Sequence, residues 1–284
     1  MNMSASASSS LDAPLIVTVA PNGAYKKIAD HAAVPVTPGQ LAETAKLCLD
    51  AGASMLHMHV RKADQSHSLE PDAYLAATRA VRQAVGNELV VQITTEAAGV
   101  YAPDEQVAAV MAVKPEAVSV GLREIALGPQ ADARVASLFS WLARERVMTQ
   151  VILYDTGDVE RWQAYRRQGV VPDAPWFLLF VLGRYSAGQT SSPSDLLPFL
   201  AIHDHAYPWA MCAFGRHEHA CAGAAAALGG HARVGFENNL SLRDGSIAPD
   251  NAALVRQVAE VAGALGRRLA TADQVRALFL GDER

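Results

Sequence analysis

Membrane-spanning segments, basic clusters and paired cysteines are all scarce in this sequence. No stretch reaches the roughly 18 uninterrupted apolar residues that a transmembrane helix needs. The net charge is −5, and Lys/Arg clusters do not exceed a pair or so, which argues against nucleic-acid and membrane-surface partners. Cys48, Cys212 and Cys221 are odd in number and form no CxxC pair, so we expect a reducing, cytoplasmic compartment.

Processing signals and linkers are missing as well. The segment MNMSASASSS has neither a basic start nor an apolar core, so we expect no secretory signal, and we predict residues 1–12 to be a disordered tail. No Gly/Pro/Ser linker interrupts residues 13–280. The sequence therefore predicts a single domain over residues 13–284. Half of the residues are hydrophobic, which is ample for a large core.

Short apolar runs alternate with amphipathic segments along the whole chain. One such segment is typical of a helix, with Thr37 as N-cap, Pro38 at the first helical position and Gly52 after the end. Comparable segments separate eight strand-like runs, at residues 15–21, 54–60, 89–95, 117–122, 149–155, 176–183, 207–215 and 232–237.

Eight strand–helix repeats in about 270 residues match the count and length of a (β/α)8 TIM barrel. An open, doubly wound sheet is the alternative, but eight repeats without a break in composition suit a closed barrel better. We therefore predict an α/β fold with one (β/α)8 barrel. Any active site should lie at the carboxyl ends of its strands.

Two histidines alternate with hydrophobic residues in the second predicted strand, SMLHMHV. Side chains two residues apart share a face of a strand, so His57 and His59 should both point into the barrel. Near the carboxyl end of the strand, they are placed to share a divalent metal. The alternative is a hydrogen-bonded pair of core histidines. The pairing of the two histidines and their position at the end of a strand favour a metal site.

A third ligand is expected from the eighth predicted strand, ARVGFENN. Alternation places Arg233 and Glu237 on one face, and the first, second and eighth strands are neighbours in a closed barrel. Two histidines and Glu237 would leave an open coordination position, as in catalytic zinc sites. Spacing leaves two roles open for Arg233: an ion pair with Glu237, or binding of a substrate carboxylate.

Other polar residues near strand ends are less specific. Thr94 and Thr95 close the third predicted strand, Ser119 lies in the fourth, and Glu124 follows it. Such residues are more often solvated or locally paired than catalytic. Their position at the expected mouth of the barrel nevertheless makes them candidates for substrate contacts.

The order of several motifs resembles the β-keto acid cleavage enzymes, which include the 3-keto-5-aminohexanoate cleavage enzyme. The likeness extends from about residue 14 to 280, and HMHVR and GGHARVGFE are its most specific parts. The resemblance implies a homotetrameric barrel with one zinc, held here by His57, His59 and Glu237. It implies a reaction of a β-keto acid with acetyl-CoA that gives acetoacetate and a new acyl-CoA. Arg233 and Thr94 match the family's catalytic arginine and hydroxyl residue.

Two positions depart from the founding pattern of that family. Asn238 replaces the acidic residue after the zinc-binding glutamate, so the general base that would form a carbanion from acetyl-CoA must be another residue; Glu124 and Glu96 are the candidates. Asn238 is left to orient a water or to donate a hydrogen bond to the thioester. Tyr25 replaces a glutamate that binds the substrate's amino group. The substrate-binding candidates are Tyr25, Thr95 and Ser119.

The same three predicted metal ligands are also compatible with two other functions. A metal-dependent aldolase or hydrolase on a barrel would also use two histidines and a glutamate, but it would not need coenzyme A. A non-catalytic, metal-stabilised barrel would close the metal with a fourth protein ligand. The expected partners are a β-keto acid and a CoA thioester, with neither nucleic acid nor membrane.

Overall fold

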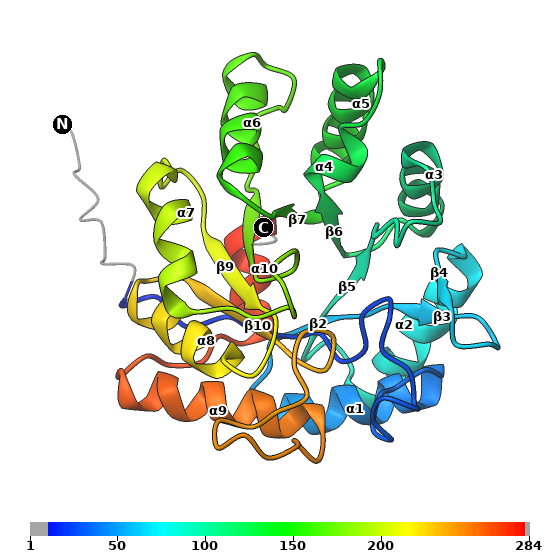
Figure 1. Cartoon of the computed structure of the whole chain (residues 1–284). Helices are drawn as coiled ribbons and strands as arrows, with labels where there is room; N and C mark the ends of the chain where they lie inside the picture. Colours follow the sequence, from blue (N-terminus) through cyan, green and yellow to red (C-terminus); the bar gives the residue numbers. More distant parts are fainter. Residues whose placement is uncertain (1–10, 282–284) are drawn as a thin grey trace.

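Eight parallel strands close into a barrel, as the sequence predicts (Figure 1). The structure, a computed structural model, describes residues 11–281, so the predicted tail lies outside the described residues apart from Leu11 and Asp12. The order around the barrel is β1-β10-β9-β8-β7-β6-β5-β2. The strands are β1 (Val17–Val19), β2 (Met55–His57), β5 (Val90–Thr94), β6 (Ala117–Gly121), β7 (Met148–Leu153), β8 (Phe177–Leu182), β9 (Trp209–Ala213) and β10 (His231–Val234).

Helices surround the strands and cover their outer faces (Figure 1). In the first of them, the Thr37 side chain accepts from the Gln40 backbone and the Gln40 side chain accepts from Thr37 in return, which confirms the predicted start. No helix in the described part of the chain is long and apolar enough to cross a membrane. The helices are α1 (Pro38–Asp50), α2 (Pro71–Val85), α3 (Pro103–Val113), α4 (Leu122–Ile125), α5 (Ala131–Arg144), α6 (Thr156–Arg167), η1 (Pro193–Leu196), α7 (Leu197–Ile202), α8 (Glu218–Ala227), α9 (Asn251–Ala264) and α10 (Ala272–Leu280).

The hydrophobic core has two parts. Leu56 and Met58 belong to the larger part, between the strands and the helices, as their alternation with the histidines predicts. Met55 belongs to the smaller part, which fills the amino-terminal half of the barrel. There α10 closes the barrel, because Phe279 packs on Phe177 with ring centroids 4.8 Å apart. The polar interior is left for the opposite, carboxyl-terminal end.

Two predicted strands are wrong at their ends. The run 54–60 is divided: β2 stops at His57, because the Asn22 side chain binds the backbone N–H and C=O of His59 in place of a neighbouring strand. The chain then forms the hairpin β3 (Val60–Arg61) and β4 (His67–Ser68), which the sequence analysis missed.

The last strand also stops early. β10 ends at Val234, so Glu237 lies in the turn that follows and not in a strand. The turn begins at Gly235, whose φ of +144° favours glycine.

Candidate active site

The two histidines and Glu237 meet inside the barrel mouth. His57 Nε2 lies 3.1 Å from His59 Nε2, and each nitrogen lies 3.4 Å from Oε2 of Glu237. Among the described residues these three form the one group of histidine, cysteine and acidic side chains close enough together to hold a metal ion. Ligand atoms about 2.0–2.1 Å from a tetrahedral zinc would be roughly 3.3–3.4 Å apart. The observed separations are close to that value.

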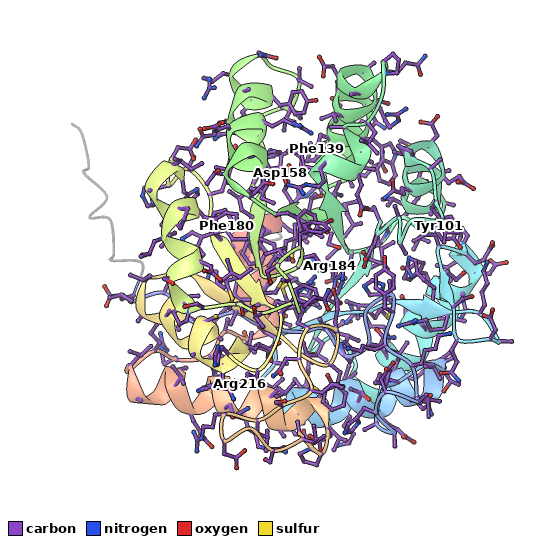
Figure 2. The ribbon with its side chains drawn as sticks, in the orientation of Figure 1. Tyr101, Phe139, Asp158, Phe180, Arg184 and Arg216 are labelled. Atoms are coloured by element: carbon purple, nitrogen blue, oxygen red, sulfur yellow. The ribbon has the colours of Figure 1, made fainter. Side chains whose placement is uncertain are left out.

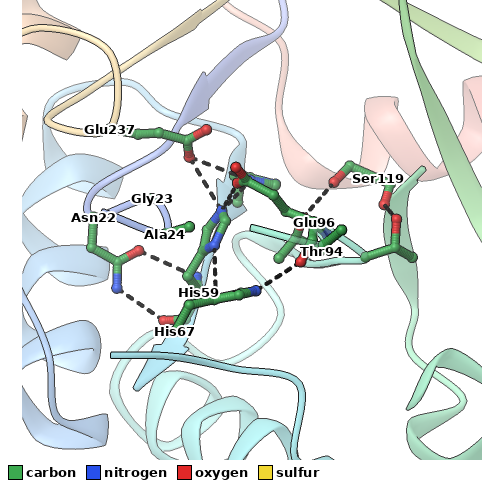
Figure 3. A network of polar contacts seen from close by, with 12 residues as sticks. Asn22, Gly23, Ala24, His59, His67, Thr94, Glu96, Ser119 and Glu237 are labelled. Carbon is green, nitrogen blue, oxygen red and sulfur yellow. Dashed lines mark hydrogen bonds and ion pairs between the residues drawn. The ribbon is translucent and has the colours of Figure 1, made fainter. Parts of the chain in front are cut away.

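Hydrogen bonds on the far side of each ring fix which nitrogen faces the centre, and Figure 3 shows those that involve His59 and His67. His57 Nδ1 lies 2.9 Å from Oε1 of Gln92, an acceptor, so Nδ1 carries the proton. His67 Nε2 donates to the carbonyl of Glu96, which leaves His67 Nδ1 to accept from His59 Nδ1, 3.5 Å away. Both Nε2 atoms therefore present lone pairs to the centre, as metal-binding histidines do.

The charge states of His57 and Glu237 suit a cation. Burial, with the charge of Arg233 second, lowers the pKa of His57 to about 3, so its imidazole is neutral. Burial opposes ionisation of Glu237, but Arg233 and the histidines outweigh it and hold its pKa well below the ordinary value. Oε2 of Glu237 is buried and makes no hydrogen bond of ordinary length to residues 11–281. Three electron-rich atoms without a proton between them fit a divalent metal.

Arg233 lies beside this centre on β10 and is buried. Its Nη2 donates to Oε1 of Glu237 at 2.9 Å, so the ion pair considered from the sequence is present. Nη2 also lies 3.5 Å from the sulfur of Cys212. Nε and Nη1 are buried and have no partner within the described chain. Because unpaired buried donors are costly, the guanidinium also has capacity to bind an anion.

A pocket opens from this centre to solvent at the carboxyl ends of the strands. It brings together most of the residues predicted from the sequence. These are Tyr25, His57, Thr94, Glu124, Arg233 and Glu237. Thr94 is placed to donate into the pocket, since its oxygen already accepts from the backbone of Glu96 and from Ser119.

Apart from the ligand His59, three predicted residues do not line the pocket of the described structure: Thr95, Ser119 and Asn238. The Thr95 hydroxyl donates to the Ser119 carbonyl, and Ser119 Oγ donates to Thr94, so both support the wall from behind. Asn238 is buried, and neither atom of its amide has a partner among residues 11–281. The roles assigned to these three residues remain predictions.

Two further carboxylates, from Glu96 and Glu124, line the same pocket. Oε1 of Glu96 lies 3.4 Å from Arg184, and Oε2 lies 3.8 Å from His59 Nε2. Oε2 of Glu124 accepts from the Ala97 backbone and from Gln106. Burial is the largest cause of a raised pKa in both glutamates; the charge of Glu237 raises the pKa of Glu96 further, and the charge of Glu96 raises that of Glu124.

Sequence reasoning missed Arg184, Tyr154 and Glu218. Both Arg184 and Tyr154 line the pocket: Arg184 follows β8, where no periodic pattern marks it, whereas Tyr154 lies within the predicted strand 149–155, on the face of Ile152, but was not singled out as a site residue. Glu218 begins α8, and its buried carboxylate accepts from the backbone of Gly235 at 3.1 Å and from Asn239 at 3.3 Å. It therefore holds the turn that carries Glu237. The motif HEH at residues 217–219 was the available signal for it.

Gly235 should tolerate no side chain. A Cβ atom there would lie 2.3 Å from the carbonyl oxygen of Ala20, and backbone cannot easily move away. We expect Gly235→Ala to lower the free energy of unfolding by roughly 2–5 kcal/mol, from positive-φ strain plus the clash. Gly245→Ala is the matched control, because φ is also positive there but nothing lies within 4 Å; it should cost about 1–2 kcal/mol. Equal denaturation midpoints for the two variants would contradict the packing argument.

The fold and the site together define a barrel enzyme with a candidate metal centre at its mouth. The family model for the beta-keto acid cleavage enzymes matches residues 14–280, so the chain belongs to that family.

Individual relatives agree with this assignment. The 3-oxoadipate:acetyl-CoA acetyltransferase of Cupriavidus necator is 28% identical over 277 residues, which cover 94% of each chain. The 3-keto-5-aminohexanoate cleavage enzyme of Fusobacterium nucleatum is 28% identical over 93% of this chain and 97% of its own. Among solved structures, ObcA in its binary complex with oxaloacetate aligns with a TM-score of 0.66 over 87% of this chain and 67% of its own. At 18% identity that likeness shows the fold alone.

Proposed function

We propose that this enzyme is a zinc-dependent transferase that converts a β-keto acid and acetyl-CoA into acetoacetate and a new acyl-CoA. The observation that carries the proposal is the convergence of three unprotonated ligand atoms, from His57, His59 and Glu237, beside Arg233. Acetyl-CoA as co-substrate is supported by the name of the Cupriavidus necator relative. Zinc is supported by the two imidazoles and one carboxylate, which leave a coordination position open.

Atom balance decides where the carbanion forms. In acetoacetate, the acetyl group comes from acetyl-CoA. The other two carbons, the carboxylate carbon and the CH2 carbon next to it, come from the keto acid. The carbanion therefore forms at the carbon between the keto group and the carboxylate, and not on acetyl-CoA as expected from the sequence. It attacks the thioester carbonyl and releases the CoA thiolate. The thiolate then adds to the original keto carbon, the old carbon–carbon bond breaks, and a proton returns to acetoacetate.

The residues of the chain divide this work by position. Arg233 binds the carboxylate next to the keto group through its unpaired donors, and Thr94 donates to a substrate oxygen. We favour Glu96 over Glu124 as the general base. Its Oε2 lies 3.8 Å from His59 Nε2, beside the three ligand atoms where the keto acid would bind. Asn238 cannot take a proton. A bound divalent metal supplies Lewis-acid polarisation of the keto carbonyl.

A direct assay separates this function from its alternatives. Purified protein is incubated with a β-keto acid, with and without acetyl-CoA, and acetoacetate and acyl-CoA are quantified. The proposal requires both products in equal amounts and only with acetyl-CoA. Turnover of the keto acid without acetyl-CoA would indicate an aldolase or hydrolase. A metal-stabilised, non-catalytic barrel would give no turnover, but among the described residues no fourth ligand joins the three.

The pocket is expected to disfavour a cationic substrate. Tyr25 and Lys26 line it, and its three carboxylates already have partners: Arg184 for Glu96, the Ala97 backbone for Glu124, and Arg233 for Glu237. We expect kcat/KM for a neutral straight-chain β-keto acid to exceed that for the 5-amino acid of similar length by about 10-fold or more, because a partly buried unpaired ammonium is costly. Both are measured at saturating acetyl-CoA. A clear preference for the amino acid would show that Tyr25 does not determine specificity.

We further propose a cytoplasmic homotetramer. All three cysteines are free and buried, as suits a reducing compartment. The tetramer rests on the family resemblance, and light scattering of the purified protein tests it.

A further inference from the structure

Arg184 occupies a distinctive position in the pocket. It follows β8 in a turn begun by Gly183, whose φ is +77°. Its guanidinium lies 4.9 Å from the ring centre of Tyr25 and 5.2 Å from that of Phe214, and its side chain is 20% exposed. Figure 2 shows it among the side chains in the middle of the ring of helices. Two aromatic faces therefore hold a cation at the mouth of the pocket.

This arginine is incompletely neutralised. Glu96 is the carboxylate paired with it in the described part of the chain, and the contact between Nη2 and Oε1 is long, at 3.4 Å. Charge-assisted hydrogen bonds are ordinarily about 2.7–2.9 Å, and a guanidinium has five N–H donors. A half-buried guanidinium with one long ionic contact keeps donors available for an anionic ligand.

The position of Glu96 also limits how far this cation lies from the proposed metal. Its two oxygens, about 2.2 Å apart in any carboxylate, lie 3.8 Å from His59 Nε2 and 3.4 Å from Arg184 Nη2. His59 Nε2 and Arg184 Nη2 are consequently no more than about 9.5 Å apart. An acid of about five or six carbons, with ordinary contacts at both ends, spans roughly 8–10 Å.

We infer that Arg184 is a subsite for a second carboxylate, at the far end of the β-keto acid, and that the preferred substrate is a β-keto dicarboxylate of about five or six carbons. The inference rests on the proposed function and deepens it. Arg233 takes the carboxylate beside the keto group, and Arg184 takes the distal one. The expected order of substrates is dicarboxylate, then neutral acid, then cationic acid.

The test compares the six-carbon β-keto dicarboxylate with the six-carbon β-keto monocarboxylate in Arg184→Gln. We expect the ratio of kcat/KM for the dicarboxylate to kcat/KM for the monocarboxylate to fall roughly 10- to 100-fold, over and above any loss that both acids share through the contact of Arg184 with Glu96. Arg184→Lys should retain part of the preference, since it keeps the charge but not the planar fork. The KM for acetyl-CoA should stay the same.

Two lysines from the neighbouring loop serve as controls. Lys27→Gln removes the same charge from a residue that does not line the described pocket, and the preference should survive. Lys26, in contrast, lines the pocket. If Lys26→Gln lost the preference for the dicarboxylate and Arg184→Gln kept it, the assignment to Arg184 would be wrong. An equal loss on both acids in Arg184→Gln would also overturn it, because it would mean that Arg184 acts through Glu96. A raised KM for acetyl-CoA alone would assign the arginine to CoA phosphates instead.

Failure of the subsite can be told from failure of the proposed function. Binding of the six-carbon 3-hydroxy dicarboxylate and 3-hydroxy monocarboxylate is measured by calorimetry, without turnover. The subsite requires tighter binding of the dicarboxylate that Arg184→Gln abolishes. Equal binding of both acids overturns the subsite even if the protein proves active as a transferase. An inactive protein that still shows the preference overturns the proposed reaction and not the subsite.

Discussion

His57→Ala should lose its bound metal and nearly all activity while remaining folded. The side chain provides one of three ligand atoms, and its Nε2 lies 3.1–3.4 Å from the other two. Loss of one ligand should weaken zinc binding by at least about 100-fold and lower kcat/KM by about 1000-fold or more. Elemental analysis of protein purified without added metal should change from about one zinc per chain to almost none.

A histidine outside the centre provides the control for that result. His217, which contacts the carbonyl of Ser191, can be replaced by alanine without touching the three ligands, so His217→Ala should keep its metal. Unchanged metal content in His57→Ala would refute the assignment. Glu237→Gln should lose activity as well, but it also leaves Arg233 as a buried charge without a partner, at a cost of about 3–5 kcal/mol. His57→Ala is therefore the cleaner variant.

The ligands could be predicted because they follow from strand geometry. A period of two places His57 and His59 on one face, and a closed barrel makes β1 the neighbour of both β2 and β10. These two facts bring Glu237 near the histidines, even though its strand ends three residues earlier. The alternation of residues could not predict where the strands end. The side chain that ends β2, Asn22, binds the backbone of a residue 37 positions away in the sequence.

Residues in irregular loops could not be predicted in the same way. Arg184 lies in a turn, where no periodicity tells which way a side chain points. Its place over Tyr25 depends on how the loops that follow β1 and β8, which are not neighbouring strands, fold over the mouth of the barrel. Glu218 shows a second limit, because a buried carboxylate that binds the Gly235 backbone looks in sequence like a solvated residue at a helix start.

Arg233→Lys should lose roughly 100- to 1000-fold in kcat/KM without unfolding the barrel. Lysine keeps a positive charge beside Glu237, so the buried ion pair that stabilises the fold is largely retained. It cannot reproduce the planar fork whose Nη2 binds Glu237 while Nε and Nη1 remain for the substrate. A loss of this size is typical when a donor aimed at developing negative charge is removed. Kinetics and denaturation midpoints are measured on the same preparations.

A second buried arginine separates catalysis from stability. Arg267 donates to the carbonyls of Ala13, Ala226 and Gly230, away from the pocket. Arg267→Lys loses that fork too, so it should lower the unfolding midpoint while activity per folded molecule stays unchanged. Arg233→Lys should instead lose activity per folded molecule and largely keep its unfolding midpoint, because of the two guanidinium groups only that of Arg233 faces the pocket. If the activity of Arg233→Lys declined only in proportion to its unfolded fraction, Arg233 would have no role beyond its ion pair with Glu237.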